Sequence, residues 1–386
     1  MIILAINQTG NLLILTYLIF IFGLDKFGDF SVGLIYSQIS IILIEWGFQT
    51  HATENLKSKS KFEPFQYFIN ATLIKIAFFF AVILIFIFFS KLKILNLASE
   101  KIFPLSLLVL FGSLNPLWFL NLFKKTKLLI YPTLIGKCIY GLIVLFYFNP
   151  STNIVFVYYL IAFQFFLNFF IGYYFVFKLF FEKYTYQNIE LFNLIKNSFT
   201  YFLSSIVNHN ITSIWGVYVV YACTSSHIGI FVYCEQIYRG MCLISNLITN
   251  SLRIELISKN LDSIKKIILK LLLIFYCCTS FLLVIIAYMT IENLNENYFW
   301  VIVFFVISWI CFSTSKLVSV PLLGSIVDMK KINYYVLAYG VLNILLIFIC
   351  YLLNLSDLNY IVFMIMIATS FDCIYYLRKT NILLKK

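Results

Sequence analysis

The chain has 386 residues, of which 62% are hydrophobic and only 11% charged, and its formal net charge is +12. So large an apolar share excludes an ordinary water-soluble domain and points to lipid as the surrounding solvent. Within lipid only helices and closed barrels satisfy every backbone hydrogen bond. The apolar runs are long and unbroken, without the alternating segments of about ten residues that a barrel shows, so we predict an all-α integral membrane protein.

Twelve apolar segments of about 20 residues each, the length that a spanning helix needs, follow one another along the chain. We predict membrane spans at residues 2–23, 31–50, 67–90, 102–122, 128–148, 154–180, 197–222, 228–249, 267–290, 298–320, 333–353 and 359–377. The connections between these spans are short. They leave no room for a separate soluble domain.

A weak internal repeat relates the two ends of the chain. Gly28 and Phe30 open the second predicted span, and Gly229 and Phe231 open the eighth, 201 residues later. Because six is even, two halves of six helices both enter the membrane from the same side, which is the parallel type of repeat found in transporters. We therefore expect two six-helix halves around a central cavity. The predicted halves are residues 1–190 and 191–386.

Basic residues gather in alternate connections, and this bias sets the orientation of a membrane protein. With both termini on the cytoplasmic side, 19 of the 28 Lys and Arg residues lie in inner connections or the C-terminal tail, and 4 lie in outer connections. We predict a multi-pass membrane protein in this orientation. Positive charge that is spread over alternate loops gives no support for nucleic-acid binding.

Polar residues follow one face of several predicted spans, at steps of three or four residues. Such stripes occur at Gln38, Glu45 and Gln49 in the second span, at Tyr201, Ser204, Asn208 and Thr212 in the seventh, and at Glu235, Arg239, Cys242, Asn246 and Thr249 in the eighth. A charge at the bilayer centre costs about 2.5–3.5 kcal/mol on insertion scales. We therefore expect these stripes to face neighbouring helices or a water-filled cavity.

Glu235 and Arg239 lie four residues apart, close enough along one helix face to form an ion pair. One interpretation is a neutralised structural pair that locks two helices together. The other is a cavity wall, in which Arg239 meets an anionic headgroup while Glu235 holds the arginine or relays a proton. The sequence leaves both interpretations open.

Two lysines and two acids inside predicted spans are further candidates for the site. Lys75 and Lys137 each lie eight or nine residues into a span, about 12–14 Å from its inner end at 1.5 Å per residue. Each lysine either turns inward or snorkels to the cytoplasmic surface. Glu45 and Asp372 lie near the inner ends of their spans. A gate or a coupling group fits that position as well as a simple interfacial anchor does.

Five segments resemble one family of membrane proteins. They are LDKFGDFSVGLIYSQ (24–38), EWGFQTHAT (45–53), NPLWFLNLFKK (115–125), NSFTYFLSS (197–205) and GIFVYCEQIYRG (229–240). Together they resemble the polysaccharide flippases, the Wzx-type translocases of O-antigen and capsule repeat units, which belong to the multidrug/oligosaccharidyl-lipid/polysaccharide exporter superfamily. The last segment is the most specific, because Glu235 and Arg239 both match the family's Glu-x-x-x-Arg helix.

The sequence also departs from the family's pattern. Glu54 stands where the family often has arginine, and Thr200 stands where a proline is common. The family's Gln-Gly and Glu after the Trp-Phe run are replaced by Asn121, Leu122 and Lys124. The resemblance therefore gives no support for a basic contact at position 54.

The resemblance implies a flippase that moves oligosaccharide repeat units on undecaprenyl pyrophosphate from the cytoplasmic to the outer leaflet by alternating access. The implied partners are membrane lipid and, within lipopolysaccharide or capsule biosynthesis, the polymerase and chain-length regulator of the same pathway. The expected cavity residues are Arg239, Lys75 and Lys137 for the pyrophosphate, Glu235 beside Arg239, Asn208, Asn210, Thr212 and Gln38 for sugar hydroxyls, and Trp118 and Trp215 for stacking on sugar rings.

Two other classes of function stay open. A cation-coupled multidrug or small-molecule antiporter of the same architecture would want acidic residues in its spans, whereas the mid-span charges here lean basic. A polysaccharide polymerase would carry a large outer loop, and an acyltransferase would want an exposed histidine beside an acid. The sequence has neither clearly, nor a C-x-x-C pair, a phosphate loop or a metal-ligand cluster. We therefore predict a transporter that is not an enzyme and has no metal and no cofactor.

Overall fold

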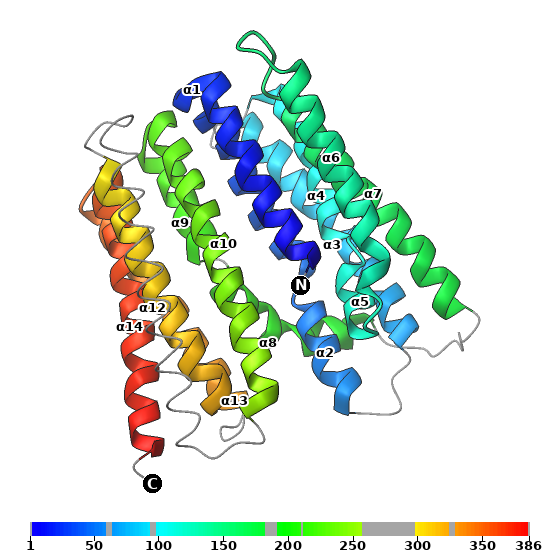
Figure 1. The fold of residues 1–386 in the computed structure, drawn as a ribbon, viewed down its shortest axis with the longest axis vertical. Helices are drawn as coiled ribbons and strands as arrows, with labels where there is room; N and C mark the ends of the chain where they lie inside the picture. The colour runs from blue at the N-terminus through cyan, green and yellow to red at the C-terminus, as the bar shows by residue number, and fades with distance from the viewer. Residues whose placement is uncertain are drawn as a thin grey trace. The chain divides into compact units, whose positions relative to one another are not determined.

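The computed structural model describes the backbone of residues 2–58, 64–92, 98–181, 191–209, 211–256, 298–323 and 329–384. Every regular element in these ranges is a helix (Figure 1). The all-α prediction is therefore confirmed for the described residues. The ninth predicted span, residues 267–290, lies outside them.

The described helices carry the lengths and apolar surfaces of a membrane protein. Six helical segments are long and apolar enough to cross a bilayer, at Gly10–Glu45, Pro64–Lys91, Ser99–Leu122, Thr126–Tyr147, Phe156–Phe180 and Leu358–Tyr375. Large side chains such as Phe20, Phe80 and Phe146 are exposed on them. Because water would disfavour so much exposed apolar surface, these faces meet lipid, and the chain is a multi-pass membrane protein.

Close contacts divide the chain into two compact units, residues 2–217 and 218–386. The helices of the N-terminal unit are α1 (Ile2–Glu45), α2 (Phe48–Ser58), α3 (Pro64–Lys91), α4 (Ser99–Ser113), α5 (Leu117–Leu122), the 3-10 helix η1 (Thr126–Leu129), α6 (Ile130–Tyr147), α7 (Phe156–Phe180), α8 (Leu191–His209) and the start of α9 (Ile211–Ala222). The C-terminal unit holds the end of α9, then α10 (Ser225–Leu256), α12 (Phe299–Leu323), α13 (Met329–Leu352) and α14 (Leu358–Leu384).

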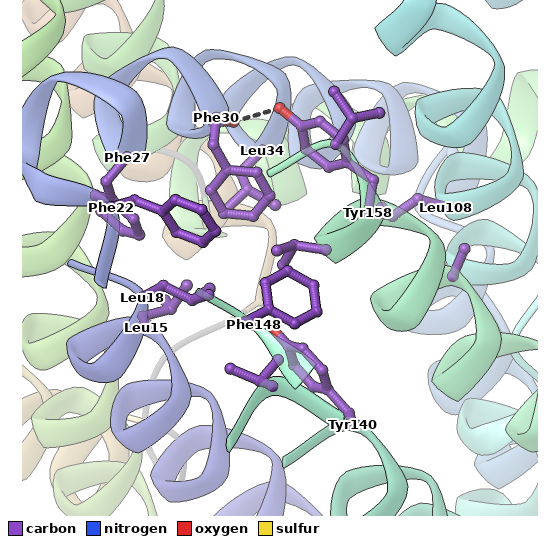
Figure 2. Packing of buried hydrophobic residues seen from close by; sticks show 14 of the residues in the cluster. Leu15, Leu18, Phe22, Phe27, Phe30, Leu34, Leu108, Tyr140, Phe148 and Tyr158 are labelled. Atoms are coloured by element: carbon purple, nitrogen blue, oxygen red, sulfur yellow. Dashed lines mark hydrogen bonds between the residues drawn. The ribbon is translucent and has the colours of Figure 1, made fainter. Parts of the chain in front are cut away.

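The core of the N-terminal unit lies where α1, α4, α6 and α7 pack together. Figure 2 shows its aromatic centre, where the rings of Phe30 and Tyr158 lie 4.6 Å apart. The Tyr158 hydroxyl donates a hydrogen bond of 2.5 Å to the carbonyl oxygen of Phe30. The one polar group of this ring is thus satisfied inside an apolar cluster, which fixes α7 against α1.

The helices differ from the predicted spans at three places along the chain. The first two spans both belong to α1, and Gly23 separates them with φ 75° and ψ 168°, a conformation that glycine adopts without the cost of a Cβ. The fourth span divides into α4 and α5 before Pro116, because proline lacks the N–H that would continue the helix. The seventh span is two helices, α8 and α9, on either side of residue 210.

The break in the seventh span follows from how α8 packs. Leu194, Ser198 and Phe202 recur at steps of four and are buried, while Phe192 and Lys196 on the other faces are exposed. The buried stripe faces α1, α2 and α3 of the N-terminal unit. Helix α8 therefore has one face that is buried against other helices and one face that is exposed.

In the C-terminal unit, α12 packs against both α10 and α14, and α13 packs against α14. The Tyr218 hydroxyl, on α9, donates a hydrogen bond of 3.0 Å to the carbonyl oxygen of Leu355, between α13 and α14. The thiol of Cys223 makes a similar contact of 3.3 Å with the carbonyl oxygen of Ser356. These two bonds satisfy carbonyls of the α13–α14 connection and tie it to the end of α9.

Candidate functional site

Lys75 is buried in the N-terminal unit, with only 3% of its surface exposed. Its Nζ donates a hydrogen bond of 2.9 Å to the carbonyl oxygen of Ser113 and lies 5.6 Å from the centre of the Trp118 ring. Ser113 is the last residue of α4, so this carbonyl has no partner within its own helix and carries the negative end of the helix dipole. The break before Pro116 thus creates the acceptor that holds the Lys75 ammonium.

Glu45 lies close enough to Lys75 for their charges to interact. It is the last residue of α1 and is half-buried. The pair does not form a direct ion pair, because the Glu235–Arg239 bridge is the one described pair with N and O within 4.0 Å. The sequence suggested a separate role for each of the two residues, and both roles stay predictions.

The second buried lysine, Lys137 on α6, is 8% exposed. Its Nζ donates a hydrogen bond to Asn11 Oδ1 on α1 and lies 5.6 Å from the centre of the Tyr140 ring. Its methylene groups pack against Gly10, where an added Cβ would lie 3.3 Å from the Lys137 Cδ. Both lysines therefore turn into the N-terminal bundle, and the snorkelling alternative does not hold in this structure.

Sequence reasoning missed a buried polar strip between α6 and α7. Gln164 and Asn168 on α7 are buried, and the Thr133 hydroxyl donates a hydrogen bond of 2.9 Å to Asn168 Oδ1. Gln164 lies against Gly136, where an added Cβ would come within 3.0 Å of its Cγ. The spacing of four between Gln164 and Asn168 was the available signal, but the aromatic run around them hid it.

The inner end of the bundle carries a second cluster beside Glu45. Trp46 and Gly47 connect α1 to α2 with φ values of 45° and 69°. The Trp46 ring stacks on Phe202 of α8 with centroids 4.1 Å apart, and its Nε1 donates a hydrogen bond of 3.3 Å to the carbonyl oxygen of Ile195. The α1–α2 turn therefore packs against α8 and forms a hydrogen bond with it.

His51 on α2 lies in the same cluster. The Tyr67 hydroxyl donates a hydrogen bond of 2.9 Å to the carbonyl oxygen of Phe48, and it lies 3.0 Å from His51 Nδ1. Because the hydroxyl proton goes to Phe48, the phenol oxygen accepts from a protonated Nδ1. Burial lowers the pKa of His51 from its usual value of 6.5, since it disfavours the charged ring.

Glu235 and Arg239 form the predicted ion pair along α10 in the C-terminal unit. Arg239 Nη2 donates a hydrogen bond of 2.6 Å to Glu235 Oε1. The Glu235 side chain is 1% exposed and that of Arg239 is 27% exposed. The carboxylate is thus neutralised inside the protein, while part of the guanidinium stays accessible. Both interpretations of the pair contain this bond, so its role stays a prediction.

Asp372 on α14 lies among polar groups of three neighbouring helices. Its charge acts on Tyr238 of α10, Cys311 of α12 and Tyr339 of α13. The side chain is half-buried. The role of Asp372 as a gate or coupling group, or as an interfacial anchor, stays a prediction.

The remaining predicted residues are spread over several helices. Gln38 is half-buried on α1, and Trp118 is buried among Tyr67, Phe68 and Phe119. Trp215 on α9 is 0% exposed. The side chains of Asn208 and Thr212, and the whole of Asn210, lie outside the described residues. The proposed contacts of these residues with sugars therefore stay predictions.

No protein-family profile and no curated protein matches the sequence. Solved structures do match over nearly the whole length. One is described as the inward-facing conformation of a multidrug resistance MATE family transporter of the MOP superfamily, with a TM-score of 0.62, 14% identity, and coverage of 98% of this chain and 96% of that chain. The chain has the fold of the MATE transporters.

Two further MATE structures agree. A MATE protein in complex with MaL6 aligns with a TM-score of 0.55 and 12% identity over 100% of this chain and 95% of that chain. A MATE protein in the straight conformation aligns with a TM-score of 0.53 and 13% identity over 100% and 94%. At identities this low the likeness establishes the fold, and confirms the predicted superfamily architecture, but it names no substrate.

Proposed function

We propose that the protein is a membrane transporter that moves its substrate by alternating access. The MATE fold supports this proposal, because the likeness extends over almost the whole of both chains. Transport through such a fold needs two states that open to opposite sides of the membrane, and rocking of two helical units supplies them. On this proposal the chain is not an enzyme.

The observation that carries the choice of substrate is the pair of buried lysines. Lys75 and Lys137 both turn into the N-terminal unit, and neither forms a direct ion pair with a carboxylate of the described residues. A buried ammonium group is costly unless acceptors or an anion stabilise it, so we propose that an anion is bound there during part of the cycle. An anionic substrate therefore fits this chain better than a cationic one.

We propose an undecaprenyl-pyrophosphate-linked oligosaccharide as that substrate, flipped from the cytoplasmic to the outer leaflet of a bacterial inner membrane. The diphosphate and the sugars cannot cross hydrocarbon unaided. Lys75, Lys137 and Arg239 would attract the diphosphate by charge-assisted hydrogen bonds. Sugar hydroxyls would meet the amides and hydroxyls proposed above, and the lipid tail would stay in the bilayer. The polymerase and chain-length regulator of O-antigen or capsule synthesis would be the partners in the pathway.

The second candidate is a cation-coupled exporter of drugs or other small molecules. The similar solved structures include one described as a multidrug resistance transporter, and this likeness supports the second candidate better than it supports the lipid-linked sugar. Glu45 and Asp372, each half-buried within a helical unit, would then bind the coupling cation. The buried lysines are the reason that we place this candidate second.

A clean gene deletion in the native host separates the candidates when three quantities are scored together. These are surface polysaccharide, the membrane pool of undecaprenyl-linked oligosaccharide, and resistance to cationic drugs. For a flippase we expect loss of surface repeat units, accumulation of the linked units on the cytoplasmic face, and unchanged drug resistance. Normal surface polysaccharide with increased drug sensitivity would instead establish the second candidate.

A further inference from the structure

We propose that the exposed face of α7 and the basic loop beside its C-terminal end form a docking surface for the substrate lipid, a long polyprenyl chain that carries a phosphate headgroup. On this proposal the lipid binds here from the surrounding bilayer before it is transported. The inference rests on the proposed function and deepens it, because it says which lipid-facing surface of the N-terminal unit receives the substrate.

Aromatic rings follow one exposed face of α7 along most of its length. They recur at steps of three or four residues, are 37–64% exposed, and form what we call the aromatic stripe: Phe163, Phe166, Phe170, Tyr174, Phe177 and Phe181. The rings of Phe166 and Phe170 lie 6.0 Å apart with 28° between their planes, so neighbouring rings present flat faces in a row. The exposed face of α3, by contrast, mixes Phe80 with Leu73 and Leu84.

Four exposed lysines lie around the C-terminal end of the aromatic stripe. One is on α7 itself, where Lys178 Nζ lies 5.8 Å from the centre of the Tyr174 ring. The other three form the basic loop, which runs from the end of α5 into η1: Lys124, Lys125 and Lys127. This loop is fixed beside α7, because η1 packs against α7 and the Phe123 ring lies 4.5 Å from that of Phe180. None of the four lysines forms an ion pair with a carboxylate of the described residues.

The backbone of the basic loop is held in one conformation. The N–H of Lys125 donates a hydrogen bond of 2.8 Å to the carbonyl oxygen of Leu120, and the N–H of Lys124 donates one of 3.0 Å to that of Asn121. These bonds form the Schellman motif that ends many helices, and Lys124, with φ 55°, occupies the position that favours glycine. A lysine there has a conformational cost that glycine would avoid, which points to a use for its side chain.

The charge and the length of this surface both favour a polyprenyl phosphate. Phosphate oxygens are strong acceptors for exposed ammonium groups, and methyl branches of the chain can pack on the ring faces. From Phe163 to Phe181 the stripe runs about 27 Å at 1.5 Å per residue. One leaflet of the hydrocarbon core is only about 15 Å thick. A phospholipid chain would therefore cover about half of the stripe, whereas a long polyprenyl chain can follow all of it.

The test uses a polyprenyl phosphate with a photoreactive diazirine in its tail, added to the purified full-length protein in detergent. After irradiation the labelled peptides are identified, and the probe concentration for half-maximal labelling of residues 156–181 is measured. We expect undecaprenyl phosphate to compete for this labelling, and dioleoyl phosphatidic acid to need at least about a tenfold higher concentration, because it covers less of the stripe. Equal competition by the two lipids would overturn the choice of a polyprenyl chain.

Two matched variants test the rings. Phe170→Leu/Tyr174→Leu keeps the face apolar but removes two rings that are 64% and 58% exposed. We expect half-maximal labelling at about a tenfold higher probe concentration. Phe80→Leu/Phe88→Leu on α3 removes rings that are 61% and 59% exposed, and should label as the wild type does. Equal effects of the two double substitutions would overturn the role of the aromatic stripe.

The lysines are tested in the same way. Lys124→Gln/Lys125→Gln/Lys127→Gln should raise the half-maximal concentration by at least about tenfold, since each lysine near a membrane surface attracts an anionic headgroup. Lys91→Gln, at an exposed lysine in the last turn of α3, should leave it unchanged. A thermal midpoint close to that of the wild type shows that each variant is folded.

Two outcomes separate this proposal from the proposed function. Label that avoids α7, while the gene deletion gives the flippase phenotype, would overturn the docking surface alone and leave this face of α7 to a protein partner. Normal surface polysaccharide with increased drug sensitivity in the deletion strain would overturn the proposed substrate and the docking surface together.

Discussion

At the scale of single residues, burial decides what each charge can do. Lys75 and Lys137 lie at the same depth within their predicted spans. The charge of Glu45 acts on Lys75, whereas Lys137 donates a hydrogen bond to the neutral amide of Asn11. Glu235, by contrast, is neutralised on its own helix by Arg239. All three basic groups stay candidates for the substrate, because the side chain of Arg239 remains 27% exposed beside its carboxylate partner.

Lys137→Met tests whether the charge of Lys137 is needed for transport. Methionine keeps an unbranched apolar side chain against Gly10 and removes the buried charge together with its desolvation cost. We expect a thermal midpoint within a few degrees of the wild type but export reduced at least tenfold, measured by complementation of the deletion strain. Lys91→Met, at an exposed lysine, should export normally. Full export by Lys137→Met would remove Lys137 from the substrate site.

Arg239 and Glu235 call for a double substitution, because Arg239→Gln alone leaves a carboxylate that is 1% exposed without its charge partner. We expect the single change to cost about 3–5 kcal/mol of stability. Glu235→Gln/Arg239→Gln should recover most of that loss. If Arg239 contacts the substrate, this stable double variant will still fail to export. Normal export by it would assign the pair a structural role.

His51 makes stability depend on pH. Its pKa is lowered in the folded protein by burial, so the unfolded chain takes up a proton first as the pH falls. The stabilisation is therefore complete above pH 6.5, the ordinary pKa, and is lost as the pH falls from there toward the lower folded pKa. We expect the thermal midpoint of the purified protein to drop between pH 7 and 5, and His51→Asn to flatten that drop. An equal drop in His51→Asn and in the control His227→Asn would contradict this assignment.

At the scale of elements, the packing of the α1–α2 turn against α8 is the feature that the sequence predicts least well. An apolar run over 197–222 predicts one straight span, because periodicity reports how buried a helix is and not which protein surface buries it. The turn at Trp46 and Gly47 presents a ring that stacks on Phe202 and an indole N–H that donates to the carbonyl oxygen of Ile195, and both of these residues are on α8. Tertiary packing has here overridden the local pattern.

Gly47→Ala tests the packing of this turn against α8 directly. Gly47 has φ 69°, and an added Cβ would lie 2.5 Å from the backbone nitrogen of Phe202. The left-handed conformation alone costs about 1–2 kcal/mol for alanine, and the backbone contact adds to it. We expect poor yield and a thermal midpoint lowered by several degrees.

Gly141→Ala supplies the matched control for Gly47→Ala. Gly141 lies inside α6, and an added Cβ there would meet only Ile14 Cδ1, at 3.9 Å. Alanine in a helix interior is favoured over glycine by about 0.5–1 kcal/mol, so this variant should be neutral or slightly more stable. Equal stability of the two variants would mean that α8 does not depend on the turn.

At the scale of the whole molecule, composition was enough to predict the class and most of the helices. In lipid the backbone hydrogen bonds of long apolar runs are satisfied within helices, so α3, α6 and α7 lie where the sequence predicts them. The hydrogen bond of Lys75 with the end of α4 was out of reach, because a polar residue on one helix does not say which distant helix it meets. Gln164 and Asn168 were missed for a similar reason, since 21 of the 25 residues of α7 are aromatic or aliphatic and hide the two amides.

The orientation of the whole chain is the last prediction, and it rests on the bias of basic residues. Single cysteines at Ser151, between α6 and α7, and at Lys125, between α5 and η1, lie at exposed positions on opposite ends of the N-terminal helices. In intact cells we expect a membrane-impermeant maleimide to label Ser151→Cys and to spare Lys125→Cys until the membrane is opened. The parent protein, with its own cysteines, gives the background. The reverse pattern would place both termini outside and would contradict the proposed direction of transport, from the cytoplasmic to the outer leaflet.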